Sequence, residues 1–292
     1  MSNNVEKKIF HLTALMYAAA LVFLSCSSAP KGQGDIYTLR DQAEAGLAAA
    51  NHEASRGNFI YASNLLTESK RIAILTDDYS LIIRVCLSYG NVLFSLGQTQ
   101  EAYAQWDHAL SEAVKYSNAE LLSLTKVHYA RGNLLSAKAD AASVLEEVVR
   151  ESVNIRNANQ YIAFTWQVRG LALRSLEMWN EAESAIRQSL DIHDRDRQLE
   201  NASYDWYIIA SIRSLSGNLQ GAMQALESSI ALDRRVENSW GLAASHRAMG
   251  DVLRKAGRED DALQAYRRSR DIYVAMGNDY EVREIDKRME LK

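Results

Sequence analysis

The sequence predicts an all-helical protein in which helical hairpins stack into one elongated body, an α-solenoid. Pro30 is the only proline among 292 residues, so long stretches lack the residue that most strongly breaks helices. Apolar residues recur at three- to four-residue spacing, and no stretch sustains the alternation typical of a strand. Small side chains also recur at intervals of about forty residues over most of the chain, which indicates a repeat architecture.

The repeat is clearest from Trp166 to Ser189, where two amphipathic segments meet at a turn near residues 176–178. The small residue of each second helix recurs at Ala62, Ala102, Ala137, Ala182, Ala222 and Ala262. A turn residue precedes each by five positions, at Gly57, Gly97, Gly132, Glu177, Gly217 and Gly257. A mostly small residue lies twelve positions before each, at Ala50, Gly90, Thr125, Gly170, Ala210 and Gly250. A mostly bulky residue follows each by four positions, at Leu66, Trp106, Ala141, Ile186, Leu226 and Tyr266.

These positions resemble the tetratricopeptide repeat family, whose pattern is a Trp, a small residue four positions later, a turn, and an Ala followed by a bulky residue. The best matches are Trp166, Gly170, Ala182 and Ile186, and then Trp206, Ala210, Ala222 and Leu226. The forty-residue spacing resembles the long-repeat subclass of that family. The resemblance covers residues 36–292 and implies an α-solenoid of about six helical hairpins plus a C-terminal capping helix. The third copy, with Thr125 and Ala141, departs most from the pattern.

Local signals give the order of the expected helices. The first has an inner stripe of Leu39, Ala43, Leu47 and Ala50, and Asp77 and Asp78 precede the third as cap candidates. The six expected pairs are 36–56 with 59–76, 79–96 with 99–115, 118–131 with 134–154, 160–176 with 179–194, 201–216 with 219–235, and 239–256 with 259–276. Residues expected to cap helix starts are Asn118, Asn159, Asn201, Asn238 and Asn278. A polar helix at 279–292 closes the stack, with Tyr280, Val282 and Ile285 facing inward.

The N-terminus predicts export and lipid attachment. The apolar run Ile9–Leu24 is shorter than the roughly 20 residues of a membrane span and has the length of a signal-peptide core. The segment Val22–Cys26 resembles the lipobox of bacterial lipoproteins, which implies that residues 1–25 are a signal peptide and that Cys26 carries palmitate-type lipid. An ordinary cleaved signal peptide with an incidental cysteine is the alternative. Residues 26–35 form a polar tether, and Ser27 implies, by the same resemblance, the periplasmic face of the outer membrane.

The sequence predicts no enzyme, cofactor or metal site. Its net charge of −4 gives no general attraction for nucleic acid. The histidines lie far apart, and the glycines are spaced as repeat turns rather than as a phosphate-binding loop. Asp191, Asp194 and Asp196 near His193 are interpreted as a solvated helix end, and Cys86 as a buried apolar residue. The large aromatics on repeat positions, Trp106, Trp166, Trp206 and Tyr266, are interpreted as core, whereas Trp179 and Trp240 lie at turns.

The first helix of each hairpin is expected to line a concave binding surface. Outward positions near its small residue select Asn91, Phe94, Lys126, Tyr129, Arg174, Tyr204, Tyr207, Ser211, Arg247, Asp251 and Arg254. Tyr and Arg are enriched at binding hot spots, so the expected contact row is Arg174, Tyr204, Tyr207 and Arg247. An ordinary solvated face is the alternative. A carboxylate clamp of the kind some tetratricopeptide proteins use is not expected, because Leu87 and Ala119 stand where cations are needed.

The functional hypothesis is a non-enzymatic, lipid-anchored scaffold that holds a protein or peptide partner at the membrane in the periplasm. Two versions, an accessory of envelope assembly and an accessory of transport, are not separated by the residues. The alternative is a surface-exposed adhesin-type lipoprotein that contacts host molecules.

Overall fold

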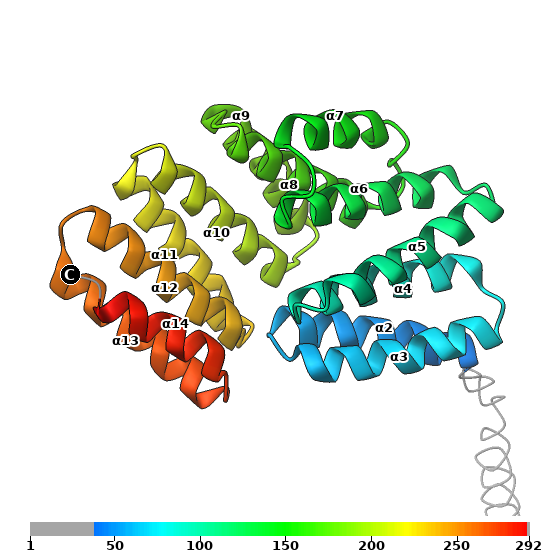
Figure 1. Ribbon diagram of the computed structural model, residues 1–292, viewed down its shortest axis with the longest axis horizontal. Coiled ribbons are helices and arrows are strands. Elements are labelled where there is room, and N and C mark those ends of the chain that lie inside the picture. Colours follow the sequence, from blue (N-terminus) through cyan, green and yellow to red (C-terminus); the bar gives the residue numbers. More distant parts are fainter. Residues whose placement is uncertain (1–37, 291–292) are drawn as a thin grey trace, which may run out of the picture. The chain divides into compact units, whose positions relative to one another are not determined.

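The computed structural model describes residues 38–290, and in this range the chain forms 13 helices, labelled α2 to α14, and no strand (Figure 1). The described helices belong to one compact unit that begins at Leu39. The predicted signal peptide, Cys26 and the whole of the predicted tether lie outside the described residues. Within the described part of the chain, every helix is too short or too polar to cross a lipid bilayer.

The helices follow one another as hairpins with a strict period. The bounds are α2 Leu39–Ser55, α3 Phe59–Leu75, α4 Tyr79–Ser95, α5 Thr99–Lys115, α6 Ala119–Leu135, α7 Ala141–Ser152, α8 Asn159–Ser175, α9 Trp179–Arg195, α10 Leu199–Leu215, α11 Leu219–Arg235, α12 Ser239–Lys255, α13 Glu259–Ala275 and α14 Asp279–Glu290. The first helix of every hairpin, and the final helix, begin forty residues after the preceding one, from Leu39 to Asp279. The all-helical, hairpin-repeat prediction is therefore confirmed.

Small residues allow the two helices of a hairpin to pack closely, as predicted. Five of the six repeat alanines, at 62, 102, 182, 222 and 262, have no exposed surface. In the fourth hairpin, a Cβ added to Gly170 would lie 2.4 Å from Cδ1 of Ile186, so only glycine leaves room for that side chain. The bulky repeat residues Leu66, Trp106, Ile186, Leu226 and Tyr266 are all fully buried in this way.

The third hairpin corrects the prediction. Its turn is not at Gly132, which lies inside α6, and Ala137 is not a buried packing residue but an exposed turn residue with a φ of 53°. The sequence GNLLSA from Gly132 resembles GNFIYA and GNLQGA, which begin at the turn glycines Gly57 and Gly217. Gly132 is instead needed for packing, because a Cβ there would lie 2.5 Å from Cζ3 of Trp106. Buried Ala130, not Thr125, occupies the small-residue position in the forty-residue period, so the predicted register of this copy was wrong by five residues. Ala141, predicted to pack as the bulky residue, is instead the first residue of α7.

Three of the five predicted caps are confirmed. The side chains of Asn118, Asn238 and Asn278 accept hydrogen bonds from the backbone N–H groups three residues later. Asn159 and Asn201 were wrong, because α8 begins at Asn159 and Asn201 lies inside α10. In α14, Ile285 is fully buried and Val282 packs on the core of the last hairpin, but Tyr280, predicted to face inward, is 64% exposed.

The first hairpin contacts the fifth and sixth, so the solenoid closes on itself. Figure 1 shows the turn between α2 and α3 beside the turn between α11 and α12. The ring of Phe59 meets Trp240 edge to face with centroids 5.3 Å apart. Arg56 donates to the backbone carbonyl of Glu237 at 3.3 Å. The inner faces of the first helices therefore surround a common space.

Candidate binding cavity

A cavity of about 530 Å³ lies inside the curve of the solenoid. Residues of α2, α4, α6, α8, α10 and α12, the first helices of the six hairpins, form most of its lining. Phe59 of α3, two residues of α11 and Asn238 in the turn before α12 complete it. The lining includes Asn51, Phe59, Ser88, Asn91, Arg131, Gln167, Glu200, Ser203, Tyr204, Tyr207, Ser229, Asp233, Asn238, Trp240, Ala244, Ser245 and Arg247. Six hairpins thus contribute to one concave site, whose volume lies in the range of ligand pockets.

Aromatic rings supply the apolar surface of the cavity. Tyr204 and Tyr207 lie one turn apart on α10 and stack with an interplanar angle of 14° and centroids 6.3 Å apart. Tyr204 keeps 41% of its surface exposed, so its ring is available for contact. Phe59 and Trp240 add a second aromatic pair where the first hairpin meets α12. Rigid rings with polar tips are efficient contact groups for peptides.

A buried carboxylate and a chain of hydroxyls form the acidic wall of the cavity. Asp233 on α11 is 1% exposed, and its carboxylate accepts a hydrogen bond of 2.8 Å from the side-chain amide of Asn238. Burial raises the pKa of Asp233 to about 6, and the negative charge of Glu200 raises it further. Hydrogen bonds from Ser203, Asn238 and Ser229 lower this pKa and offset part of the increase. The hydroxyl of Ser229 lies 3.0 Å from those of both Ser203 and Ser245.

Two arginines, Arg131 on α6 and Arg247 on α12, bring positive charge to the lining of the cavity. Arg131 on α6 has no hydrogen bond or ion pair within residues 38–290. Arg247 on α12 is occupied, because its guanidinium donates to the carboxylate of Glu281 at 2.7 Å. Asn91 on α4 uses its carbonyl oxygen on His128 Nδ1 at 3.1 Å, which leaves its amide N–H groups for another partner. The cavity therefore presents a free guanidinium on α6 and carboxylates on α10 and α11.

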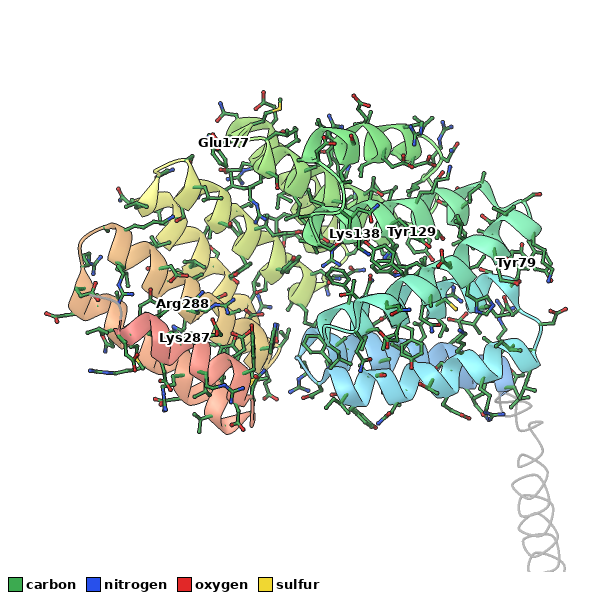
Figure 2. The ribbon with its side chains drawn as sticks, in the orientation of Figure 1. Tyr79, Tyr129, Lys138, Glu177, Lys287 and Arg288 are labelled. Atoms are coloured by element: carbon green, nitrogen blue, oxygen red, sulfur yellow. The ribbon has the colours of Figure 1, made fainter. Side chains whose placement is uncertain are left out.

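The structure places four of the predicted contact residues around this cavity: Asn91, Tyr204, Tyr207 and Arg247. The remaining ones lie elsewhere and have partners within the chain. Lys126 donates to Glu151 at 3.0 Å, and Arg174 donates to Ser211 at 3.2 Å. Tyr129, labelled with Lys138 in Figure 2, packs against Trp106 and hydrogen-bonds to Asp107.

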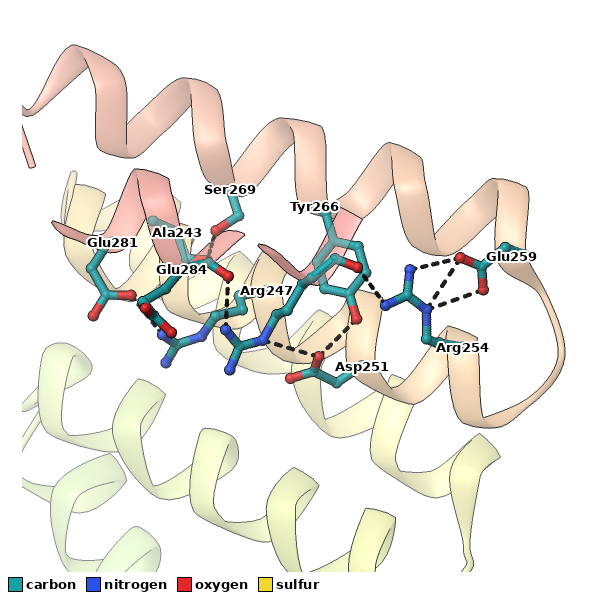
Figure 3. Close-up of polar contacts among 10 residues, drawn as sticks. Ala243, Arg247, Asp251, Arg254, Glu259, Tyr266, Ser269, Glu281 and Glu284 are labelled. Atoms are coloured by element: carbon teal, nitrogen blue, oxygen red, sulfur yellow. Dashed lines mark hydrogen bonds and ion pairs between the residues drawn. The ribbon is translucent and has the colours of Figure 1, made fainter. Parts of the chain in front are cut away.

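The last two predicted residues belong to a polar network between α12, α13 and α14 (Figure 3). Asp251 accepts a hydrogen bond of 2.7 Å from the Tyr266 hydroxyl, and Arg254 pairs with Glu259 at 2.6 Å. These groups hold the last hairpin and α14 together. Phe94 stacks against Trp106 with centroids 6.0 Å apart, so it is also part of the internal packing.

Sequence reasoning missed Arg131, Gln167, Glu200, Asp233 and Trp240. The register of the third copy explains the first of these. The residue directly after the small residue faces outward. With Thr125 as the small residue this position is Lys126, whereas with Ala130 it is Arg131. Glu200, Asp233 and Trp240 lie near helix ends, away from the mid-helix positions that the repeat pattern indicates.

A buried Ser, His and Asp cluster lies beside the cavity without hydrolase geometry. Nδ1 of His193 lies 2.6 Å from the Asp205 carboxylate and 3.4 Å from the hydroxyl of Ser189, which also donates to Asp205. In a catalytic triad the serine and the aspartate contact different ring nitrogens. His193, Ser189 and Asp205 are buried. Asp191, Asp194 and Asp196 near His193, interpreted as a solvated helix end, are exposed. The cluster joins α9 to α10, and Gln167 connects it to the cavity by donating to Asp205 at 2.7 Å.

Cys86 and the large aromatic side chains at the repeat positions are buried or partly buried in the core. Cys86 is fully buried as predicted, and burial raises its pKa to about 11, which suppresses the reactive thiolate. No group of three His, Cys, Asp or Glu side chains within residues 38–290 could hold a metal ion. Trp106 and Tyr266 are fully buried, whereas Trp166 and Trp206 are partly buried against the core.

Comparisons with solved structures identify the fold. BtubC (BKLC) from P. vanneervenii aligns with a TM-score of 0.54 and 14% identity over 80% of this chain and 92% of that chain. A Rap protein complexed with competence and sporulation factor aligns with a TM-score of 0.59 and 15% identity over 85% of this chain and 73% of that chain. A tetratricopeptide repeat protein from Parabacteroides merdae aligns over 86% of this chain and 98% of that chain, with 15% identity and a TM-score of 0.39. No protein-family model and no curated protein matches the sequence. The chain has an α-solenoid fold of consecutive helical hairpins, and its repeat pattern resembles that of tetratricopeptide proteins.

Proposed function

We propose that this protein is a non-enzymatic scaffold that binds an extended peptide, or a peptide segment of a larger partner, in its central cavity. We further propose that lipid on Cys26 holds it at the periplasmic face of a bacterial membrane, most consistently the outer membrane. The observation that carries the binding proposal is the convergence of six hairpins on one cavity that combines exposed rings with polar groups that have free hydrogen-bonding capacity.

The lining fits a peptide better than a purely apolar ligand. An extended peptide carries backbone N–H and C=O groups that must be satisfied when they leave water. Asn51 and Ser88 have no partner within the described residues, and Asn91 retains free amide N–H groups, so this wall offers such hydrogen bonds. The stacked rings of Tyr204 and Tyr207 offer contact to side chains of the same peptide.

The charges of the cavity favour a peptide with groups of both signs. An acidic group is stabilised beside Arg131, whose guanidinium has no partner in the described chain. A basic group is stabilised beside Glu200, whose carboxylate oxygen Oε1 lies 3.3 Å from Nδ1 of His52. A Rap protein of similar fold is complexed with competence and sporulation factor, which supports a binding role for this architecture.

The test is selection from a phage-displayed library of random peptides on the immobilised protein. The cavity variant is Ala244→Trp, which places an indole among the lining residues. The matched control is Ala231→Trp, because Ala231 is exposed on α11 and does not line the cavity. We expect enriched peptides to bind the wild type and the Ala231 variant equally and to bind the Ala244 variant at least about tenfold more weakly. Failure to enrich any peptide, or equal binding by the Ala244 variant, would contradict the proposal.

A further inference from the structure

The third hairpin interrupts the regular repeat at α7. In the other five hairpins the second helix has 17 residues, and three residues connect it to the next helix. In the third hairpin α7 has only 12 residues, and the longer segment 153–158 connects it to α8. This longer connection is fixed, because Glu120 accepts hydrogen bonds of 3.0 and 2.8 Å from the backbone N–H groups of Arg156 and Asn157. Ile155 from the connection is 5% exposed and belongs to the hydrophobic core.

A small pocket lies at this interruption. Its volume is about 190 Å³, and its lining comes from α7, Ile155 and α8. The lining residues are Val148, Ser152, Ile155, Ile162, Thr165, Trp166 and Arg169. None of them lines the central cavity, so the two sites are separate. We call it the Arg169 pocket.

The arginine of this pocket lacks the partner that its position requires. The Nε atom of Arg169 is buried and has no hydrogen-bond partner among the described residues. Its guanidinium lies 5.0 Å from the centroid of the Trp166 ring, which orients the group but accepts no hydrogen bond in the plane of the fork. A buried donor on a charged group is costly when it is unsatisfied, so such a group calls for an acceptor. By contrast, partly buried Arg213 directs Nε and Nη2 to the Glu183 carboxylate at 3.1 and 2.7 Å.

We propose that the Arg169 pocket is a second ligand site, which takes a small carboxylate with an apolar body. A carboxylate matches the guanidinium fork and is the acceptor that Arg169 lacks. The aliphatic side chains of Val148, Ile155 and Ile162 would cover the body of the ligand. A dry cavity of about 150 Å³ holds one benzene molecule, so this pocket has room for an aromatic ring or a short alkyl chain.

The carboxylate has two possible sources, a free monocarboxylic acid or the C-terminus of a peptide that ends in an apolar residue. Calorimetric titration of the full-length protein distinguishes them. The free-acid probe is 3-phenylpropionate, and its neutral control is 3-phenylpropionamide. The peptide probe is the tripeptide Ala-Ala-Phe, and its control is the same tripeptide with an amidated C-terminus.

We expect 3-phenylpropionate to bind with a stoichiometry of one and at least about tenfold more tightly than its amide, because only the carboxylate satisfies the guanidinium. Arg169→Met should remove this preference, Arg169→Lys should restore part of it, and Arg267→Met, which changes an exposed arginine on α13, should leave it unchanged. Binding of the tripeptide as well would assign the site to a peptide terminus, and binding of the free acid alone would assign it to a small metabolite acid.

Two results would overturn the proposal. One is equal binding of each carboxylate and its amide by the wild type, a comparison that does not depend on any variant folding. The other is unchanged carboxylate binding by the Arg169→Met variant. Neither result bears on the central cavity, whose test uses different ligands and different residues.

Discussion

The ring of Trp240, on α12, lies so close to Gly57, in the turn between α2 and α3, that a Cβ on Gly57 would stand 2.8 Å from it. These residues are 183 positions apart in the sequence, and they bring the first hairpin against the sixth. Gly57 has a φ of 83°, so it also supplies the left-handed conformation that ends α2. One glycine thus serves both a local turn and the closure of the solenoid around its cavity.

Gly57→Ala should destabilise the protein more than Gly97→Ala. Gly97 has a similar φ of 77° in the equivalent turn of the second hairpin, but a Cβ there would meet nothing within 4 Å. Alanine at either position strains the backbone by about 1 kcal/mol, whereas at Gly57 the contact with Trp240 adds a further 1–3 kcal/mol, roughly. Unfolding in urea measures both values, and equal losses would show that the closure contributes nothing to stability.

The packing register of the third hairpin has its own test. Ala182→Leu should lower the free energy of unfolding by roughly 1–3 kcal/mol, because Ala182 is fully buried between α8 and α9. Ala142 occupies the equivalent position in the forty-residue period but is exposed on the short α7, so Ala142→Leu should change stability by less than about 0.5 kcal/mol. A large loss at Ala142 would mean that α7 packs as the other second helices do.

The helical hairpins and their spacing were predictable because each is set by residues close together in the chain. Small and bulky residues at fixed offsets report the packing of one helix on the next, and they did so in five hairpins. They failed in the third because Gly132 serves packing against Trp106, while a non-glycine residue, Ala137, takes the left-handed turn conformation. Glycine therefore serves interhelical packing at position 132, whereas at positions 57 and 217 it provides the left-handed conformation of a turn.

The cavity was only partly predictable because it depends on long-range geometry. Local spacing identified Tyr204, Tyr207, Arg247 and Asn91, which face the inside of the curve. The contact of Phe59 with Trp240 arises from small rotations added over six hairpins, and no pair of neighbouring residues encodes it. Groups brought in by this closure, such as His52 beside Glu200, could not be found from the sequence.

Tyr204→Ala should weaken peptide binding by about tenfold without loss of stability, because an exposed tyrosine in a concave site is a typical hot spot. The matched control is Tyr280→Ala on α14, since Tyr280 is 64% exposed and lies outside the cavity. Peptides selected on the wild type provide the ligands, and fluorescence anisotropy measures their dissociation constants. Equal effects of the two changes would remove Tyr204 from the binding site.

Stability should fall as the pH drops from about 6.5 to 4. Burial lowers the pKa of His128 to about 3 and that of His246 to about 4, with nearby arginines acting in the same direction. The unfolded chain then binds more protons than the folded one below the ordinary pKa of 6.5, so each histidine costs up to about 1.4 kcal/mol per pH unit as the pH falls.

Asp233 opposes this trend. Its pKa is raised from 3.8 to about 6, so between these values the folded state binds more protons and gains stability as the pH falls. Two histidines outweigh one aspartate, and the net slope should be a loss. Urea unfolding at pH 7, 6, 5 and 4 measures it. Asp233→Asn should make the loss steeper, and a shallower loss in this variant would contradict the assigned direction.

Cys26→Ser should abolish incorporation of labelled palmitate and release the protein from the membrane fraction of bacterial cells. The matched control is Cys86→Ser, because Cys86 is buried in α4 and its pKa is raised to about 11, so it should not be acylated. Lipidation contributes about 0.8 kcal/mol of membrane affinity per buried methylene group, so loss of the acyl chains removes the anchor. Palmitate label that persists in the Cys26 variant would rule out this residue as the lipid attachment site.

Protease treatment of intact cells separates the two orientations. A protein on the periplasmic face stays intact until the outer membrane is opened, whereas a surface-exposed adhesin is cleaved at once.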